Sequence, residues 1–181
     1  MSQNNALSLW SESAQQQIKD AVLAAKRTTE QPFAVFDADN TIWKHDIEEA
    51  LLAWLEYKGL LSIESLPTSI FPLPPRPNET IFSYYSYLAD IDHALCYLWA
   101  CQAFVGFSLK TIHQQSNDML SSEEPIPTII YQNGKALSRT VPIPKIFPAQ
   151  RQLISFLMEQ DINVWVVSAS LEEIVRAVVS H

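Results

Sequence analysis

Two short apolar segments are each followed by side chains that could carry out group transfer. The first segment, Phe33 to Phe36, leads into Asp37, Asp39 and Thr41, and the second, Ile162 to Val167, leads into Ser168. If both segments are strands of one parallel sheet, these side chains lie beyond the carboxyl ends of the strands, where ligands bind in open α/β sheets. The spacing therefore predicts one site built from two carboxylates and two hydroxyls.

A carboxylate pair two residues apart can divide the work of phosphoryl transfer. Repulsion between two close negative charges favours protonation of one of them, while a cation such as Mg²⁺ can hold the other as a carboxylate. We expect Asp37 to be the ionised nucleophile and Asp39 to donate a proton to the leaving oxygen. Because phosphoryl transfer needs mainly positioning and charge neutralisation, the candidate phosphate-binding residues are Asn40, Thr41 and Ser168.

The same residue types also occur for purely local reasons. Asp, Asn and Thr are all favoured in turns and at helix caps, so an Asp-x-Asp-x-Thr segment alone does not distinguish a site from an ordinary turn. Its place directly after one apolar strand, together with a second apolar strand that ends at Ser168, favours the functional interpretation.

The elements that must position these residues follow from the apolar pattern. Apolar residues recur at helical spacing from Trp10 to Ala25, and Phe33 to Phe36 is an uninterrupted apolar run, typical of a strand covered on both faces. Further along we expect, in order, a helix over 46–58, a proline-rich connection, helices over about 78–119, a hairpin at Asn133-Gly134, and then a helix, a strand and a final helix.

This order predicts an α/β fold with a large insertion. Two apolar strands joined by a crossover form a parallel-sheet unit, and about 100 residues between them are too many for a loop. We therefore predict an incomplete Rossmann-like parallel-sheet core from residues 1–44 and 145–181. A mainly helical cap, residues 45–144, is inserted after the first strand.

Composition and charge argue against several classes of partner. The sequence has a net charge of −8 and no run of Lys or Arg, which disfavours a nucleic-acid partner. No apolar stretch approaches the roughly 20 residues that cross a bilayer, so no membrane segment is expected. Residues 1–17 lack the basic start and apolar core of a secretory signal, which predicts a cytoplasmic protein; a periplasmic protein whose signal had been removed would look the same.

The segments FDADNT and VVSAS resemble the first and second motifs of the haloacid dehalogenase superfamily, in its phosphoserine-phosphatase-like branch. The resemblance implies an aspartyl-phosphate intermediate on Asp37, acid–base catalysis by Asp39 and phosphate binding by Ser168. It also implies that the Asp37 side chain and the Asp39 backbone carbonyl hold Mg²⁺. The insertion then corresponds to a cap that closes over a small phosphomonoester substrate.

Three longer segments, residues 46–56, 82–110 and 147–170, are similar to bacterial phosphorylcholine phosphatases. A trimethylammonium head group is recognised by aromatic faces and a carboxylate, for which the candidates are Trp43, Glu79, Tyr84 and Tyr85. The alternative for each is packing in the core. A phosphoserine-phosphatase-like hydrolase is the nearest alternative function. The carboxylate of its substrate would call for a cation in the cap, and Lys110 is the only Lys or Arg over 78–119.

In this superfamily a lysine and further Mg²⁺-binding carboxylates come from third and fourth motifs after the second, and the sequence ends at His181. We therefore expect weak Mg²⁺ binding and little turnover from this polypeptide, which would be truncated or completed by another chain. An unpaired sheet edge at Phe33 to Phe36 would then be open to self-association or to a completing chain. The hypothesis from a different class is a non-catalytic remnant that binds a ligand or partner through the cap.

Overall fold

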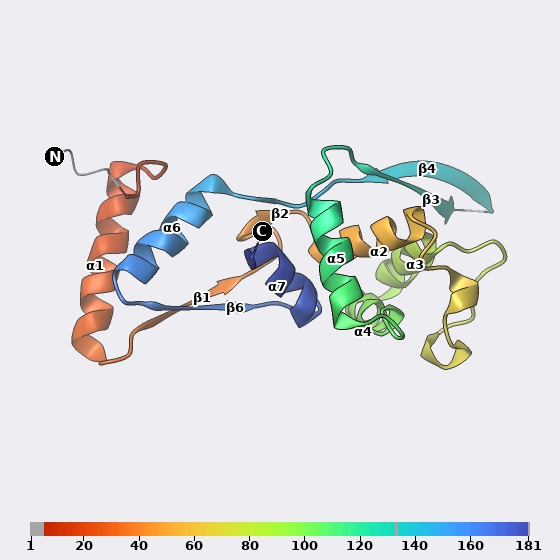
Figure 1. Cartoon of the computed structure of the whole chain (residues 1–181), viewed down its shortest axis with the longest axis horizontal. Coiled ribbons are helices and arrows are strands. Elements are labelled where there is room, and N and C mark those ends of the chain that lie inside the picture. Colours follow the sequence, from red (N-terminus) through yellow and green to blue (C-terminus); the bar gives the residue numbers. More distant parts are fainter. Residues whose placement is uncertain (1–5, 133, 181) are drawn as a thin grey trace. The chain divides into compact units, whose positions relative to one another are not determined.

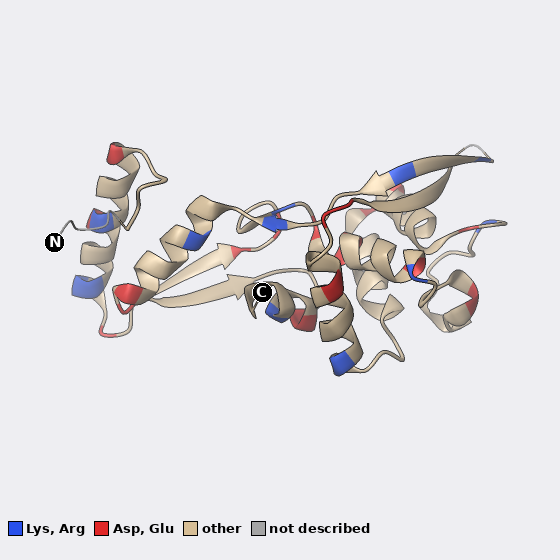
Figure 2. Cartoon of the chain, turned by 45° about the horizontal axis from the view of Figure 1, so that its top comes forward, with Lys and Arg blue, Asp and Glu red and all other residues tan. Residues whose placement is uncertain are grey.

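The computed structural model describes residues 6–132 and 134–180, and the chain divides into two compact units (Figure 1). Unit 1 comprises residues 1–44 and 145–168, and unit 2 comprises residues 45–144 and 169–181. The acidic and basic residues are distributed over elements of both units (Figure 2). No helix in the part of the chain that the structure describes is both long enough and apolar enough to cross a membrane.

Unit 1 is built around a parallel pair of strands. Its elements are α1 (Glu12–Thr28), β1 (Phe33–Asp37), β2 (Trp43–Lys44), β5 (Lys145–Ile146), α6 (Pro148–Glu159) and β6 (Asn163–Val167). Strands β1 and β6 run parallel, with Phe33 opposite Asn163 and Asp37 opposite Val167, while β2 and β5 form a short antiparallel pair. The predicted parallel strands and the insertion between them are confirmed.

Only one face of the β1–β6 pair is covered within unit 1. Ala34, Phe36 and Val164 pack against a core whose buried members come from α1, α6 and their flanking segments, namely Leu7, Val22, Phe156, Leu157 and Ile162. On the opposite face, Phe33, Val35, Trp165 and Val167 are 64%, 54%, 63% and 63% exposed. We call these four side chains the open sheet face. The prediction that the first strand is covered on both faces is therefore wrong, because α1 and α6 supply apolar side chains to the same side.

Unit 2 is mainly helical and has its own core. Its elements are α2 (Ile47–Tyr57), the short 3-10 turns η1 (Ile63–Ser65) and η2 (Thr68–Ile70), α3 (Ile81–Ile91), α4 (His93–Ala103), α5 (Leu109–Leu120), β3 (Ile126–Gln132), β4 (Lys135–Val141) and α7 (Glu172–Ser180). Helix α2 is apolar around most of its circumference, as expected for a helix surrounded by other elements. The fully buried side chains of this core include Leu51, Leu55, Ile81, Leu88 and Met119.

The predicted hairpin is present as β3 and β4, which pair antiparallel from Ile126 opposite Val141 to Gln132 opposite Lys135. Gly134 has a φ of +73°, the left-handed conformation that a tight two-residue hairpin turn requires. Asn133, the other predicted turn residue, lies outside the described residues.

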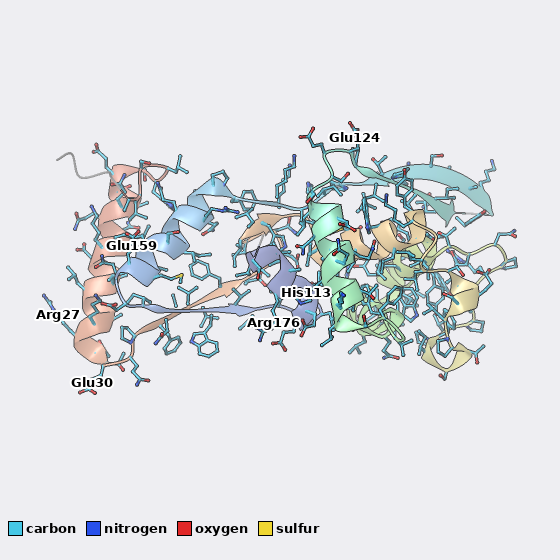
Figure 3. All side chains as sticks on the ribbon, in the orientation of Figure 1. Arg27, Glu30, His113, Glu124, Glu159 and Arg176 are labelled. Atoms are coloured by element: carbon cyan, nitrogen blue, oxygen red, sulfur yellow. The ribbon has the colours of Figure 1, made fainter. Side chains whose placement is uncertain are left out.

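The last helix makes its contacts within unit 2. Helix α7 packs against α5, where His113 Nε2 lies 2.7 Å from Glu173 Oε2 (Figure 3). The N–H of Leu171, just before α7, donates to Glu48 Oε1 of α2 at 3.2 Å. Residues 169–181, which the sequence pattern grouped with the core, thus group with unit 2 because α7 presents its apolar residues to α5.

Candidate active site

The segment after β1 is a tight turn wound around one carbonyl oxygen. Ala38 O accepts hydrogen bonds from the N–H groups of Thr41, Ile42 and Trp43 at 3.1, 2.8 and 3.4 Å. Asn40 takes up the left-handed conformation in this turn, with a φ of +57°, which Asn tolerates better than most residues. The turn therefore places side chains four residues apart next to each other.

Asp37 is the last residue of β1 and its side chain is exposed. Its Oδ2 accepts a hydrogen bond from the hydroxyl of Thr41 at 2.9 Å. This contact fixes the rotation of the carboxylate. Among the described residues, Oδ1 of Asp37 has no hydrogen-bond partner, so its lone pairs point to where a substrate or a cation could approach. An exposed, oriented carboxylate at a strand end is what a nucleophile in this position needs.

Asp39 is half-buried, and its Oδ1 accepts a hydrogen bond from the indole Nε1–H of Trp43 at 2.7 Å. Trp43 itself has no exposed surface. A ring without an exposed face cannot stack on a bound head group, so the predicted ligand contact through Trp43 does not fit this structure. Its place is beneath the site, holding the second carboxylate.

Ser168 directly follows β6 and is half-buried. Because Asp37 is paired with Val167 in the sheet register, Ser168 is one residue beyond the position opposite the candidate nucleophile. Neighbouring strands lie about 4.8 Å apart. The backbone therefore brings Ser168 and Asp37 to the same end of the same sheet, as the sequence predicted. Asn40 is exposed beside them, and its phosphate-binding role stays a prediction.

The structure offers a small oxygen donor set for a cation. Among the described residues, no three His, Cys, Asp or Glu side chains gather closely enough to hold a metal ion. Mg²⁺, however, usually keeps several waters and is held by one or two carboxylates together with substrate phosphate. The exposed Asp37 carboxylate and the Asp39 backbone carbonyl match that requirement in chemical type.

Two of the predicted head-group residues have other partners in unit 2. Glu79 is buried and accepts from Arg76 at 2.6 Å (Nε) and 2.9 Å (Nη2), and the Arg76 guanidinium also lies 4.2 Å from the centre of the Tyr87 ring. This hydrogen bond from Arg76 to Glu79 raises the pKa of Arg76. The Tyr84 hydroxyl donates to Leu73 O at 2.6 Å. Both residues therefore serve packing and ion pairing here, which is the alternative weighed for them.

Tyr85 is buried in unit 2, and its contact with a head group stays a prediction. It is 7% exposed, and its pKa is raised mainly by burial and further by the negative charges of Asp46 and Glu49. Asp46 caps α2, accepting from the Glu49 N–H at 2.8 Å. Asp46 and Glu49 thus lie at the start of α2, where acidic side chains interact favourably with the helix dipole.

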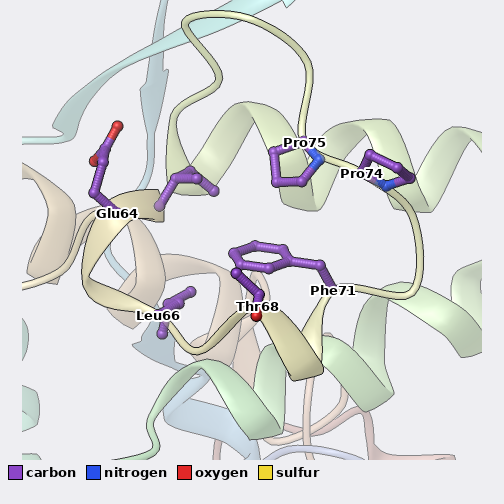
Figure 4. A pocket seen from close by; sticks show the side chains of 7 residues that line it. Glu64, Leu66, Thr68, Phe71, Pro74 and Pro75 are labelled. Carbon is purple, nitrogen blue, oxygen red and sulfur yellow. The ribbon is translucent and has the colours of Figure 1, made fainter.

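A separate cavity lies in unit 2 beneath the proline-rich connection (Figure 4). It has a volume of about 460 Å³ and is lined by Ile63, Glu64, Leu66, Thr68, Phe71, Pro74 and Pro75. The ring of Phe71 stands between the prolines and the η1–η2 turns, and its edge meets Tyr84 at 5.3 Å between centroids. The lining is apolar apart from Glu64 and Thr68, so the cavity supplies no group for phosphate.

This chain was compared with protein-family models, with curated proteins and with solved structures. No family model matches it. It is 40% identical over 150 residues to the phosphorylcholine phosphatase of Pseudomonas aeruginosa, an alignment that covers 81% of this chain and 43% of that protein. The chain is related to a phosphatase. It spans less than half of that relative's length, so the activity of the whole relative is not carried over directly.

The fold has a counterpart among solved structures. The structure of a conserved protein of unknown function from Anaerococcus prevotii is similar, with a TM-score of 0.56 and 17% sequence identity. The superposition covers 93% of this chain and 63% of that protein. At this identity the similarity establishes the fold alone. The predicted α/β class, a Rossmann-like parallel-sheet core with a large helical insertion after the first strand, is confirmed by the structure and by this neighbour.

Proposed function

We propose that this chain carries the nucleophile-bearing part of a Mg²⁺-dependent phosphomonoester hydrolase of the haloacid dehalogenase type. The observation that carries the proposal is the Asp37 carboxylate. It is exposed at the end of β1, oriented by Thr41 and paired in the sheet with Val167, the residue before Ser168, in a chain that is 40% identical to a phosphatase. Mg²⁺ bound by Asp37 and the Asp39 carbonyl would neutralise charge on the phosphoryl oxygens.

The chain's own residues divide the reaction into two displacements. In the first, an oxygen of Asp37 forms a bond to phosphorus, the bond from phosphorus to the alcohol oxygen breaks, and Asp39 gives its proton to that oxygen. In the second, a water oxygen attacks the phosphorus of the aspartyl-phosphate, Asp39 takes the proton of the water, and the bond to Asp37 breaks to release phosphate. The hydroxyl of Ser168 and the amide of Asn40 would donate to the phosphoryl oxygens. The one proton of the Thr41 hydroxyl is donated to Asp37 Oδ2, so Thr41 orients the nucleophile instead.

For the substrate we propose a phosphomonoester with a cationic head group, of the phosphorylcholine class. The named activity of the relative motivates this choice, and the side chains that we propose for the head group are Tyr85 and the acidic Asp46 and Glu49 of the same unit. Phosphoserine fits less well, because its carboxylate calls for a cation in the cap helices and Lys110 is the only Lys or Arg over residues 78–119.

Covalent trapping tests the nucleophile directly. The purified chain is mixed with Mg²⁺ and phosphorylcholine or p-nitrophenyl phosphate, quenched in acid, and digested for mass spectrometry. We expect phosphate on the peptide that contains Asp37, lost on treatment with hydroxylamine and absent from Asp37→Asn. Phosphate release should fall on the order of 10³-fold or more in that variant. Labelling that persists in Asp37→Asn would refute the assignment.

The non-catalytic hypothesis has its own outcome in the same experiment. Because the chain spans 43% of the relative, the assay is repeated with the remaining part of the Pseudomonas aeruginosa phosphatase added as a separate polypeptide. If no label forms under either condition while calorimetry detects choline binding that Tyr85→Ala abolishes, the chain is a ligand-binding remnant and the hydrolase proposal fails.

A further inference from the structure

We infer that Trp43 is a positioning residue for Asp39: its indole N–H holds Oδ1 of that carboxyl group and thereby fixes the rotation of the acid that gives and takes the proton. The consequence for proton transfer rests on the proposed function, whereas the contact itself does not. Trp43 donates from Nε1 to Asp39 Oδ1 at 2.7 Å, and Trp43 has no exposed surface. The distance is at the short end for N–H···O bonds.

The indole N–H restricts the protonation of Asp39 because it can only donate a hydrogen bond. A hydroxyl or an amide could turn and offer a lone pair, but indole Nε1–H has no acceptor to present. Oδ1 of Asp39 must therefore remain an acceptor whether or not the acid carries a proton, and a proton can reside only on Oδ2. A buried indole N–H without a partner would be costly, which works against rotation of the carboxyl group.

Trp43 is itself fixed by backbone pairing on both sides. As part of β2 it is opposite Ile146 of β5, and Phe147 N donates to Ile42 O at 2.9 Å. Its own N–H donates to Ala38 O at 3.4 Å, which ties it to the turn that carries Asp39. Strand β5, which follows the insertion, thus holds Trp43 in place, and Trp43 in turn orients Asp39. Helix α6 begins two residues after β5, at Pro148.

The test uses Trp43→Phe, which keeps an aromatic ring in the buried position and removes the N–H. The matched control is Trp10→Phe in the same unit, which loses an indole hydrogen bond to Ala149 O of 3.0 Å. A misplaced proton donor matters most when the leaving group needs a proton. We therefore expect Trp43→Phe to lose about tenfold or more in kcat with phosphorylcholine, because its leaving group, choline, would depart as an alkoxide unless protonated. With p-nitrophenyl phosphate, whose phenolate leaves without a proton, we expect a loss of less than about threefold. Trp10→Phe should change neither.

A second readout is independent of turnover. In ¹H–¹⁵N spectra of the chain, the indole resonance of Trp43 is identified by its loss in Trp43→Phe. We expect it downfield and protected from exchange with solvent, and we expect Asp39→Ala to move it upfield and shorten that protection while the Trp10 indole stays unchanged. If the Trp43 resonance ignores Asp39→Ala, the inference is overturned, whatever the activity.

The two readouts separate the inference from the proposed function. A resonance that responds to Asp39→Ala in a chain that forms no phosphoenzyme supports the contact and refutes the hydrolase. Equal losses on both substrates in Trp43→Phe, with Trp10→Phe unaffected, show that Trp43 does not act through proton donation and overturn the positioning role.

Discussion

The carboxylate of Glu56 caps the start of α3, and two substitutions there separate hydrogen bonding from charge. Its oxygens accept from Ile81 N at 2.6 Å and from Phe82 N at 3.2 Å, and the hydroxyl of Thr128 lies 3.5 Å away. Burial nevertheless dominates and raises the pKa of Glu56 above its ordinary value. The structure therefore predicts a residue whose acceptor oxygens matter more than its negative charge.

Glu56→Ala removes the acceptor and leaves two N–H groups of α3 without it. A buried donor that loses its partner costs about 1–3 kcal/mol, and these two are partly buried, so we expect the free energy of unfolding to fall by about 2–3 kcal/mol. Glu56→Gln keeps a carbonyl acceptor and carries no charge to desolvate. We expect it to remain within about 1 kcal/mol of the wild type.

The pH dependence fixes the sign of the charge effect. Because the pKa of Glu56 is higher in the folded than in the unfolded chain, the folded state binds the proton more tightly, and this stabilisation is complete below the ordinary value of 4.5. It is lost as the pH rises through the raised pKa. Glutamine cannot titrate, so the free energy of unfolding of Glu56→Gln relative to wild type should improve as the pH rises through that window.

Urea denaturation followed by circular dichroism, at several pH values between about 4 and 7, measures all three proteins under one protocol. Two results would refute the reasoning. The first is that Glu56→Gln lowers the free energy of unfolding as much as Glu56→Ala at neutral pH. The second is that the difference in free energy of unfolding between Glu56→Gln and wild type does not change with pH.

Three further predictions follow from other parts of the structure. Asn40→Ala should destabilise the chain by about 1 kcal/mol more than Asn40→Gly in the same denaturation experiment, because residue 40 has a positive φ, which glycine adopts without strain. The open sheet face leaves on the order of 400 Å² of apolar surface, so we propose that it mediates weak self-association. Sedimentation should then show a concentration dependence that Trp165→Lys removes and that Leu23→Lys, at an exposed position on α1, does not. Burial and, after it, the charge of Glu48 raise the pKa of Cys101 to about 12. Because the thiolate is the reactive form, iodoacetamide at pH 8 should modify Cys101 about a thousandfold more slowly than an ordinary thiol. The modification should be faster in Glu48→Gln than in the wild type.

Local patterns sufficed to predict the strands and the hairpin, because each apolar run is bounded by turn residues and both ends are marked in the sequence. They did not reveal which face of β1 is covered. Ala34 and Phe36 face the helices while Phe33 and Val35 do not, yet all four are apolar. Apolar character on both sides predicts two covered faces, and only the directions of α1 and α6 show that unit 1 supplies one cover.

The site was predictable at its carboxylates and not around them. Strand-end positions identify Asp37 and Asp39, whereas the roles of Thr41 and Trp43 depend on how the chain turns after Ala38. Asn40 has a positive φ within this turn, and the turn brings Trp43 onto Asp39 four residues earlier. The pairing of Glu79 with Arg76 is different. Its three-residue spacing and opposite charges are visible in the sequence and favour an ion pair over an open ligand site.

The pairing of β2 with β5 makes the insertion a module with adjacent ends. Lys44 is directly opposite Lys145 in an antiparallel ladder, so the residues that leave for the insertion and return from it are about 5 Å apart at their Cα atoms. A two-residue Asn-Gly turn spans that gap. Exchange of residues 45–144 for such a turn therefore asks no rearrangement of the β2–β5 ladder that carries Trp43, but it removes the α5 surface against which α7 packs. Residues 169–181 belong to the same unit and must be exchanged together with the insertion.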